Sequence, residues 1–140
     1  MPETTLPLRR CLLLGLATFL LMLPETLPVP VLRPLVVERF DVSSSAASWF
    51  MAANLLGALL AAPRIGSWVE RTGHRRRPCV IALLVDAALM QALAHPHDYV
   101  SFLLLRVAEG AAHITALTLL MSLVADAAGS RRGRALGCLG

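Results

Sequence analysis

The sequence predicts an all-α protein that crosses a membrane several times. Of its 140 residues, 56% are hydrophobic and only 16% are charged, and the mean hydropathy is +0.67. A soluble domain carries roughly 25% charged residues, so too few polar side chains are present to cover a globule. The apolar residues fall in long runs separated by short polar segments, as expected when the bilayer is the solvent.

The basic residues are all arginines, and with nine acidic residues they give a net charge of +4. They form short clusters between apolar runs, which is typical of membrane topology and not of a nucleic-acid groove. We therefore expect the lipid bilayer and no nucleic acid as partner. The cysteines Cys11, Cys79 and Cys138 lack metal-ligand spacing. We interpret them as small apolar residues and expect no disulfide, metal or cofactor.

The first span is predicted over residues 11–35, after a cytoplasmic N-terminal segment at residues 1–10. A secretory signal peptide has a similar apolar run, but no A-x-A-like cleavage site follows this one. Four prolines lie in or near its second half, and prolines are tolerated where neighbouring helices satisfy the freed backbone groups. We expect a bent membrane helix, followed by a short polar loop at residues 38–41.

A second span is predicted over residues 46–69, with the hydroxyl groups of residues 43–45 as helix caps. At 1.5 Å per residue it is long enough to cross a hydrocarbon core of about 30 Å. Small side chains along it would let another helix approach closely. These are Gly57, Ala58, Ala61, Ala62 and Gly66.

Two further spans are predicted over residues 78–94 and 99–125, and residues 135–140 begin a fifth apolar run. Pro78 suits the first turn of the third span, because its missing N–H group is not needed there. His95 and His97 flank a proline in the intervening turn and are interpreted as solvated loop residues. Asp126 and a second basic cluster follow the fourth span.

Arginine counts predict the orientation of these spans. With the N-terminus in the cytoplasm, ten arginines lie on the cytoplasmic side, and only Arg33 and Arg39 lie outside. The positive-inside rule favours this arrangement, and we place the protein in the cell (inner) membrane as a multi-pass protein.

Ionisable residues within the predicted spans are functional candidates, because burying charge in a bilayer is costly. Glu25 lies in the first span and Asp86 in the third. Arg106, Glu109 and His113 lie in the fourth span and share one face of a helical wheel with Gly110, which must look into a bundle or a wet cavity.

Two interpretations of these charges remain open. In the functional one they line a proton and substrate pathway, since desolvation favours a protonated carboxylate that can load and release a proton. In the structural one, Arg106 and Glu109 neutralise each other at i and i+3. Asp86 has no visible partner, and in the structural interpretation it pairs with a helix absent from this chain.

The segment between the second and third spans reads Gly66-Ser-Trp-Val-Glu70-Arg71-Thr-Gly73, followed by His74 and three arginines. It resembles the signature of the major facilitator superfamily in sequence and in position. The resemblance implies a cytoplasmic gate in which Glu70 meets a helix N-terminus, Gly73 permits the turn, and an arginine reaches Asp126. The gate would include Gly66, Glu70, Arg71, Gly73, Arg75, Arg76 and Asp126.

Other segments resemble the proton-coupled drug antiporters of that superfamily. Arg106-Val-Ala-Glu109-Gly110 is similar to their arginine-and-glycine motif, and residues 131–137 are similar to the basic turn before their fifth helix. Glu25 and Pro34 fit the pattern of their first helix. Leu27, Pro30 and Asn54 depart from the residues expected at their positions.

The resemblance implies an N-terminal fragment of a twelve-helix secondary transporter that exports small organic molecules, with protons as the coupling ion. Two alternatives remain: a sugar or metabolite permease of the same superfamily, and a non-transporting four-helix membrane protein that binds a partner. An enzyme is not expected, because no span carries a nucleophile–base pair or metal-ligand spacing.

Overall fold

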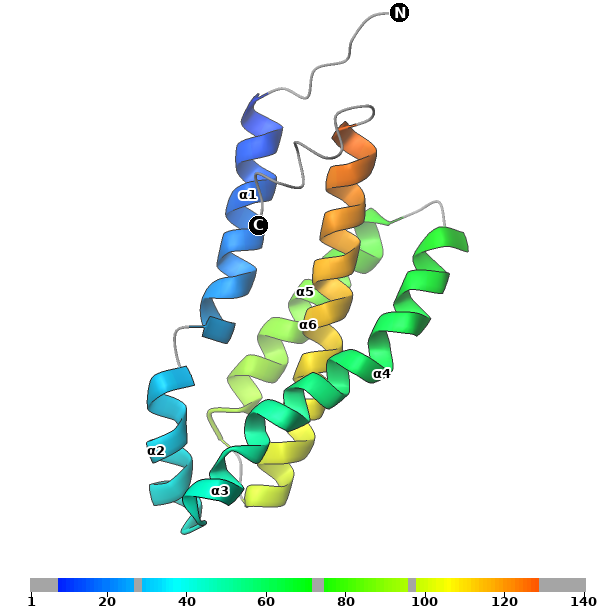
Figure 1. Ribbon diagram of the computed structural model, residues 1–140. Helices are drawn as coiled ribbons and strands as arrows, with labels where there is room; N and C mark the ends of the chain where they lie inside the picture. Colours follow the sequence, from blue (N-terminus) through cyan, green and yellow to red (C-terminus); the bar gives the residue numbers. More distant parts are fainter. Residues whose placement is uncertain (1–7, 27–28, 72–74, 96–97, 129–140) are drawn as a thin grey trace, which may run out of the picture.

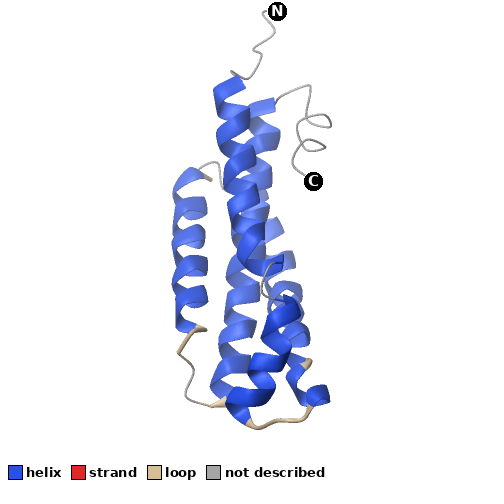
Figure 2. Cartoon of the chain, turned by 90° about the vertical axis from the view of Figure 1, so that its left-hand side faces the viewer, coloured by secondary structure: helices blue, strands red, loops and turns tan. Residues whose placement is uncertain are grey.

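The computed structural model describes residues 8–26, 29–71, 75–95 and 98–128, and this described part contains helices and no strands. The longer helices run alongside one another as an elongated bundle (Figures 1 and 2). The helices are α1 (Leu8–Thr26), α2 (Val29–Phe40), α3 (Ser44–Ala47), α4 (Trp49–Arg71), α5 (Arg76–Ala92) and α6 (Tyr99–Ala128). The predicted all-α fold class is confirmed. The predicted start of a fifth span lies outside the described residues.

The first predicted span is divided between two helices. α1 ends at Thr26 and α2 begins at Val29, with residues 27–28 outside the described part. A proline has no N–H group and its ring crowds the preceding turn, so closely spaced prolines interrupt a helix. Pro30 is the second residue of α2, a position where the N–H group has no intrahelical partner in any case. The expected bend is therefore a break in the helix.

The predicted polar loop at residues 38–41 is mostly helical, because α2 continues to Phe40. Asp41 then adopts a φ of 51°. This left-handed conformation ends the helix, and aspartate is one of the few residues that adopt it at modest cost. Arg39 donates a hydrogen bond of 3.1 Å to the carbonyl oxygen of Ala94, which ties the end of α2 to the α5–α6 connection.

The predicted serine cap is confirmed at the start of α3. The hydroxyl oxygen of Ser43 accepts a hydrogen bond of 3.1 Å from the N–H group of Ala46. The chain turns at Ser48, whose N–H group bonds the carbonyl oxygen of Ser45, and α4 begins immediately afterwards. The second predicted span is therefore a capped turn followed by a 23-residue helix.

The third and fourth predicted spans correspond to α5 and α6, with small differences at their ends. α5 begins at Arg76, two residues before Pro78, which still occupies the first turn. α6 ends at Ala128 and is 30 residues long. Asp98 caps its start, because its carboxylate accepts hydrogen bonds of 2.8 Å from the N–H and hydroxyl groups of Ser101.

α6 is the central helix of the bundle. α4 and α5 both pack extensively against it, and α1 packs against it as well (Figure 1). One apolar core joins α1, α5 and α6 around Leu21, Cys79 and Leu119. A second core joins α2, α3, α4 and α6, where the rings of Phe40 and Phe102 have centroids 5.5 Å apart.

The exterior of this bundle is strongly apolar. Leu55 and Leu59 of α4 are 68% and 69% exposed, and other large apolar side chains of α1, α4 and α5 are similarly open. Residues 44–68 and 99–126 are each long and apolar enough to cross a membrane. α5, with 17 residues, is at the lower end of the spanning range of about 17–25 residues. Such a surface suits lipid and not water.

α4 and α6 cross at a pair of glycines. A Cβ atom added to Gly57 would collide with the backbone carbonyl of Val107, and one added to Gly110 would collide with that of Asn54. These contacts confirm that Gly57 permits close approach of another helix. A Cβ atom at Gly66 would meet nothing within 4 Å among the described residues. Gly66 therefore plays no packing role within the described part.

This contrast predicts opposite effects of the same substitution. Gly57→Ala should destabilise the bundle by about 1–3 kcal/mol, because backbone atoms must separate to admit the methyl group. Gly66→Ala, the matched control, should raise stability slightly, because alanine favours a helix by up to about 1 kcal/mol over glycine. Thermal unfolding of the purified chain in detergent measures both effects. Equal shifts for the two variants would contradict the close crossing.

Candidate functional site

A buried polar cluster lies where α4, α5 and α6 meet. α4 and α5 each contribute one polar side chain, and α6 contributes three that are spaced three and four residues apart. The cluster comprises Asn54, Asp86, Arg106, Glu109 and His113.

Arg106 and Glu109 form the buried ion pair of this cluster. The Nη1 atom of Arg106 lies 2.8 Å from the Oε2 atom of Glu109, and their side chains are 6% and 0% exposed. The guanidinium carbon of Arg106 also lies 5.8 Å from the ring centroid of Phe50, within cation–π range. The i, i+3 pairing inferred as the structural interpretation is present. It does not exclude function, because a buried pair holds both groups in a fixed place.

Asn54 joins this pair from α4. Its Nδ2 atom donates a hydrogen bond of 2.6 Å to the same Oε2 atom of Glu109. From the sequence, Asn54 was notable only as a departure from a family pattern. The signal that could have identified it is its position as a lone amide in an apolar helix, where such groups bond to a neighbouring helix.

Asp86 of α5 faces His113 of α6. The Nδ1 atom of His113 lies 3.7 Å from the Oδ2 atom of Asp86, which is too long for a hydrogen bond but close enough for an ion pair when the imidazole is protonated. Asp86 therefore faces a partner within this chain. Its Oδ1 atom is buried and has no hydrogen-bond partner among the described residues. This carboxylate is thus incompletely satisfied.

The net charge of the cluster depends on whether it has bound one proton. With Asp86 and Glu109 ionised and Arg106 positive, it carries a charge of −1 when His113 is neutral. One added proton on His113 or Asp86 brings the total to zero. The formal charge of this buried cluster therefore depends on whether one proton is bound, and an isolated net charge is costly in a low-dielectric interior.

The same groups have part of the geometry of a metal site. Asp86, Glu109 and His113 each place a ligand atom within 4.8 Å of the others. The Oε2 atom of Glu109, however, already accepts from Arg106 and Asn54. The fixed positive charge of Arg106 would oppose a metal cation here.

The remaining residues predicted for the proton and substrate pathway lie elsewhere or cannot be placed. Gly110 packs against the backbone of Asn54, so its position serves the helix crossing. Glu25 belongs to α1, but its side chain is outside the described part.

One contact of the predicted gate is present at the other end of α6. The Nη1 atom of Arg75 lies 2.6 Å from the Oδ2 atom of Asp126, and these side chains are 22% and 54% exposed. Arg71 and Arg76 are exposed. The side chain of Glu70 and all of Gly73 lie outside the described residues. The structure therefore shows that α5 and α6 are linked at this end by an arginine–aspartate pair.

The model of the Major Facilitator Superfamily matches residues 14–140, so the chain belongs to this superfamily. Its members are membrane transporters of small molecules and not enzymes. Comparison with curated proteins and comparison with solved structures give no match.

The buried ion pair makes a prediction about stability. Arg106→Met or Glu109→Gln alone should destabilise the protein by about 3–5 kcal/mol, because each substitution leaves the other charge buried without its counter-ion. The double variant should recover much of this loss, because neither charge remains. Thermal unfolding of the four proteins in detergent gives the coupling free energy. Additive effects would mean that the two groups act independently.

Proposed function

We propose that this chain supplies helices of a proton-coupled secondary transporter that exports small organic molecules by alternating access. Asp86, Arg106, Glu109 and His113 form its proton site, and Glu25 belongs to the same pathway by its position in the first span. The observation that supports this proposal most directly is the buried cluster, whose charge is balanced by one proton.

Proton binding at this cluster would couple to substrate through charge. The proton-loaded cluster is neutral and tolerates a dry, closed environment. Loss of the proton leaves a net charge of −1, which water or a polar substrate group must compensate. The deprotonated state therefore favours opening of the site, and the protonated state favours closure. If the proton and the substrate each compensate this same negative charge, binding of one displaces the other, and the two are exchanged.

The cytoplasmic gate of this transporter would include the Arg75–Asp126 pair. Gly66, Glu70, Arg71, Gly73 and Arg76 belong to the same proposal because of their motif. An exposed ion pair contributes at most about 1 kcal/mol, so it can form and break as helices move. Such a weak contact suits a gate better than a permanent clamp.

The coupling proposal is tested by substrate flux and proton movement in membrane vesicles that carry the natural gene product. Asp86→Asn should reduce proton-coupled flux to background, because the amide cannot take up the proton or balance His113. Asp41→Asn is a matched control, since it makes the same chemical change at an exposed residue outside the cluster, and asparagine also adopts its left-handed conformation.

These flux measurements distinguish a proton-coupled transporter from the alternative functions. Absence of flux and of proton movement across a broad substrate panel would refute a proton-coupled transporter. Flux of sugars or metabolites that survives Asp86→Asn would favour a permease without proton coupling at this cluster. Arg106→Lys should restore only part of the activity lost in Arg106→Ala, because an ammonium group cannot reproduce the planar guanidinium fork.

The gate proposal makes a separate prediction. Arg75→Asp should strongly reduce transport, because two acidic groups then repel each other at the end of α5 and α6. Exchanging the pair, with Arg75→Asp and Asp126→Arg in one protein, should restore much of the activity while net charge stays constant. Flux is compared at equal membrane levels of each variant. Failure of the exchange to recover any flux would show that the contact itself is not required.

A further inference from the structure

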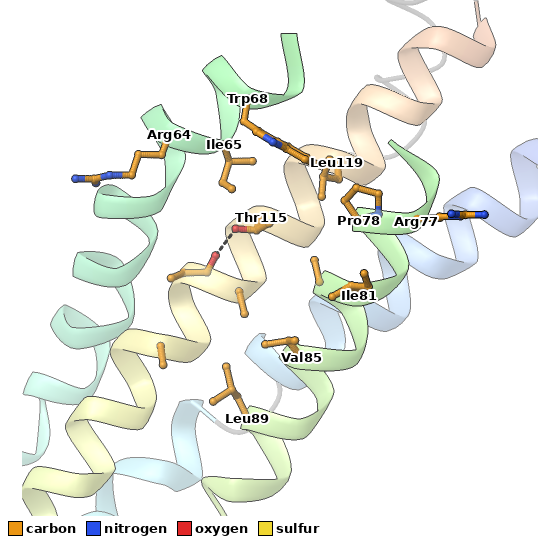
Figure 3. A pocket seen from close by; sticks show the side chains of 14 residues that line it. Arg64, Ile65, Trp68, Arg77, Pro78, Ile81, Val85, Leu89, Thr115 and Leu119 are labelled. Carbon is orange, nitrogen blue, oxygen red and sulfur yellow. Dashed lines mark hydrogen bonds between the residues drawn. The ribbon is translucent and has the colours of Figure 1, made fainter. Parts of the chain in front are cut away.

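A long groove lies along the face of α6 that carries Ala108, Ala111 and Thr115, between α4 and α5. It has a volume of about 1010 Å³ and is lined by residues of all three helices (Figure 3). It forms because α4 and α5 both pack on α6 but make few contacts with each other. The buried polar cluster is not part of its lining.

The walls of the groove are almost entirely apolar. Ile81, Val85 and Leu89 of α5 form one side, and small alanines of α6 form its floor. Thr115 is a polar residue on the floor, but its hydroxyl group donates a hydrogen bond of 2.6 Å to the carbonyl oxygen of Ala111 (Figure 3). The walls therefore favour a hydrocarbon chain over a polar molecule.

One end of the groove is cationic. Arg64 of α4 and Arg77 of α5 contribute to the lining there, and their guanidinium groups extend to opposite sides of this end (Figure 3). Among the described residues, Arg64 donates one hydrogen bond of 2.6 Å, to the carbonyl oxygen of Leu60, and a guanidinium group has five N–H donors in all. Trp68 lines the same end of the groove, and tryptophan is enriched at membrane–water interfaces. This end therefore has the chemistry of the headgroup region.

The length of the groove matches one leaflet. Its lining on α5 runs from Arg77 to Leu89, twelve residues apart, or about 18 Å at 1.5 Å per residue. Half of a typical hydrocarbon core is about 15 Å. With the arginines at the membrane surface, the apolar part ends near the bilayer midplane.

We propose that this groove binds one anionic phospholipid of the cytoplasmic leaflet. Its headgroup lies at the cationic end, outside the apolar walls, where either Arg64 or Arg77 contacts the phosphate. An acyl chain runs along the alanines of α6, past Val85 to Leu89 of α5. Charge complementarity selects an anionic headgroup, because the described residues that line the groove include two arginines and no acidic side chain. The site is independent of proton coupling and needs only that the chain spans a membrane with Arg64 and Arg77 at the cytoplasmic side.

The two tryptophans of the chain allow a direct test. Trp68 lines the groove, and Trp49 is exposed at the opposite end of α4. Trp49→Phe leaves Trp68 as the single reporter, and Trp68→Phe leaves Trp49 as the matched control. Each variant is reconstituted into phosphatidylcholine vesicles that contain either brominated phosphatidylglycerol or brominated phosphatidylcholine at the same mole fraction. Bromine on the acyl chains quenches tryptophan fluorescence on contact.

Quenching of Trp68 should show that brominated phosphatidylglycerol binds the groove about fivefold more strongly than brominated phosphatidylcholine does. This ratio is the size expected for one arginine near an anionic headgroup. Arg64→Gln together with Arg77→Gln should bring this ratio close to one and leave the quenching curves of Trp49 unchanged. Three outcomes would overturn the proposal. These are equal quenching of Trp68 by both lipids, a preference that survives the arginine substitutions, and no quenching by either lipid, which would mean that protein covers the groove.

Discussion

The close crossing of α4 and α6 is the contact on which the rest of the structure depends. Gly57 and Gly110 allow the two backbones to touch, and this approach brings the amide of Asn54 within 2.6 Å of Glu109. A longer separation would leave a fully buried carboxylate with one fewer donor, at a cost typical of an unsatisfied polar group. Packing and electrostatics therefore depend on the same contact. The glycines that let the helices approach also let α4 donate a hydrogen bond to the buried carboxylate.

α6 links the two polar regions of the molecule as one uninterrupted helix. It carries Glu109 and His113 in the buried cluster and Asp126 at the end that contacts Arg75. Glu109 and Asp126 are separated by 17 residues, or about 26 Å along the helix axis. A small tilt of α6 at the cluster would displace Asp126 by a larger amount. The partner residues in these two regions are Asp86 and Arg75, on α5 and at its start. Relative motion of α5 and α6 would therefore change the contacts in both regions.

Much of this arrangement could be predicted from the sequence, and the exceptions share a physical cause. The polar face of α6 and the cap at Ser43 follow from spacing within one segment, and the reach of an arginine to Asp126 follows from topology. The pairing of Asp86 with His113 and of Asn54 with Glu109 depends on how far one helix slides along another. That register is decided by side-chain packing between segments and has no local signal. The C-terminal end of α2 was not predicted for a local reason. The helix continues to Phe40 because it ends only where Asp41 adopts a left-handed conformation.

The division of charge among three helices has a consequence for how the chain enters the membrane. An aspartate or arginine at the centre of a lone spanning helix costs about 2.5–3.5 kcal/mol during insertion. α5 carries Asp86 on only 17 residues, and its facing partner His113 belongs to α6, which is synthesised later. α5 is therefore a poor membrane segment until α6 arrives. Biogenesis of this protein should favour insertion of the two helices as a hairpin, with the polar groups facing each other before either meets lipid.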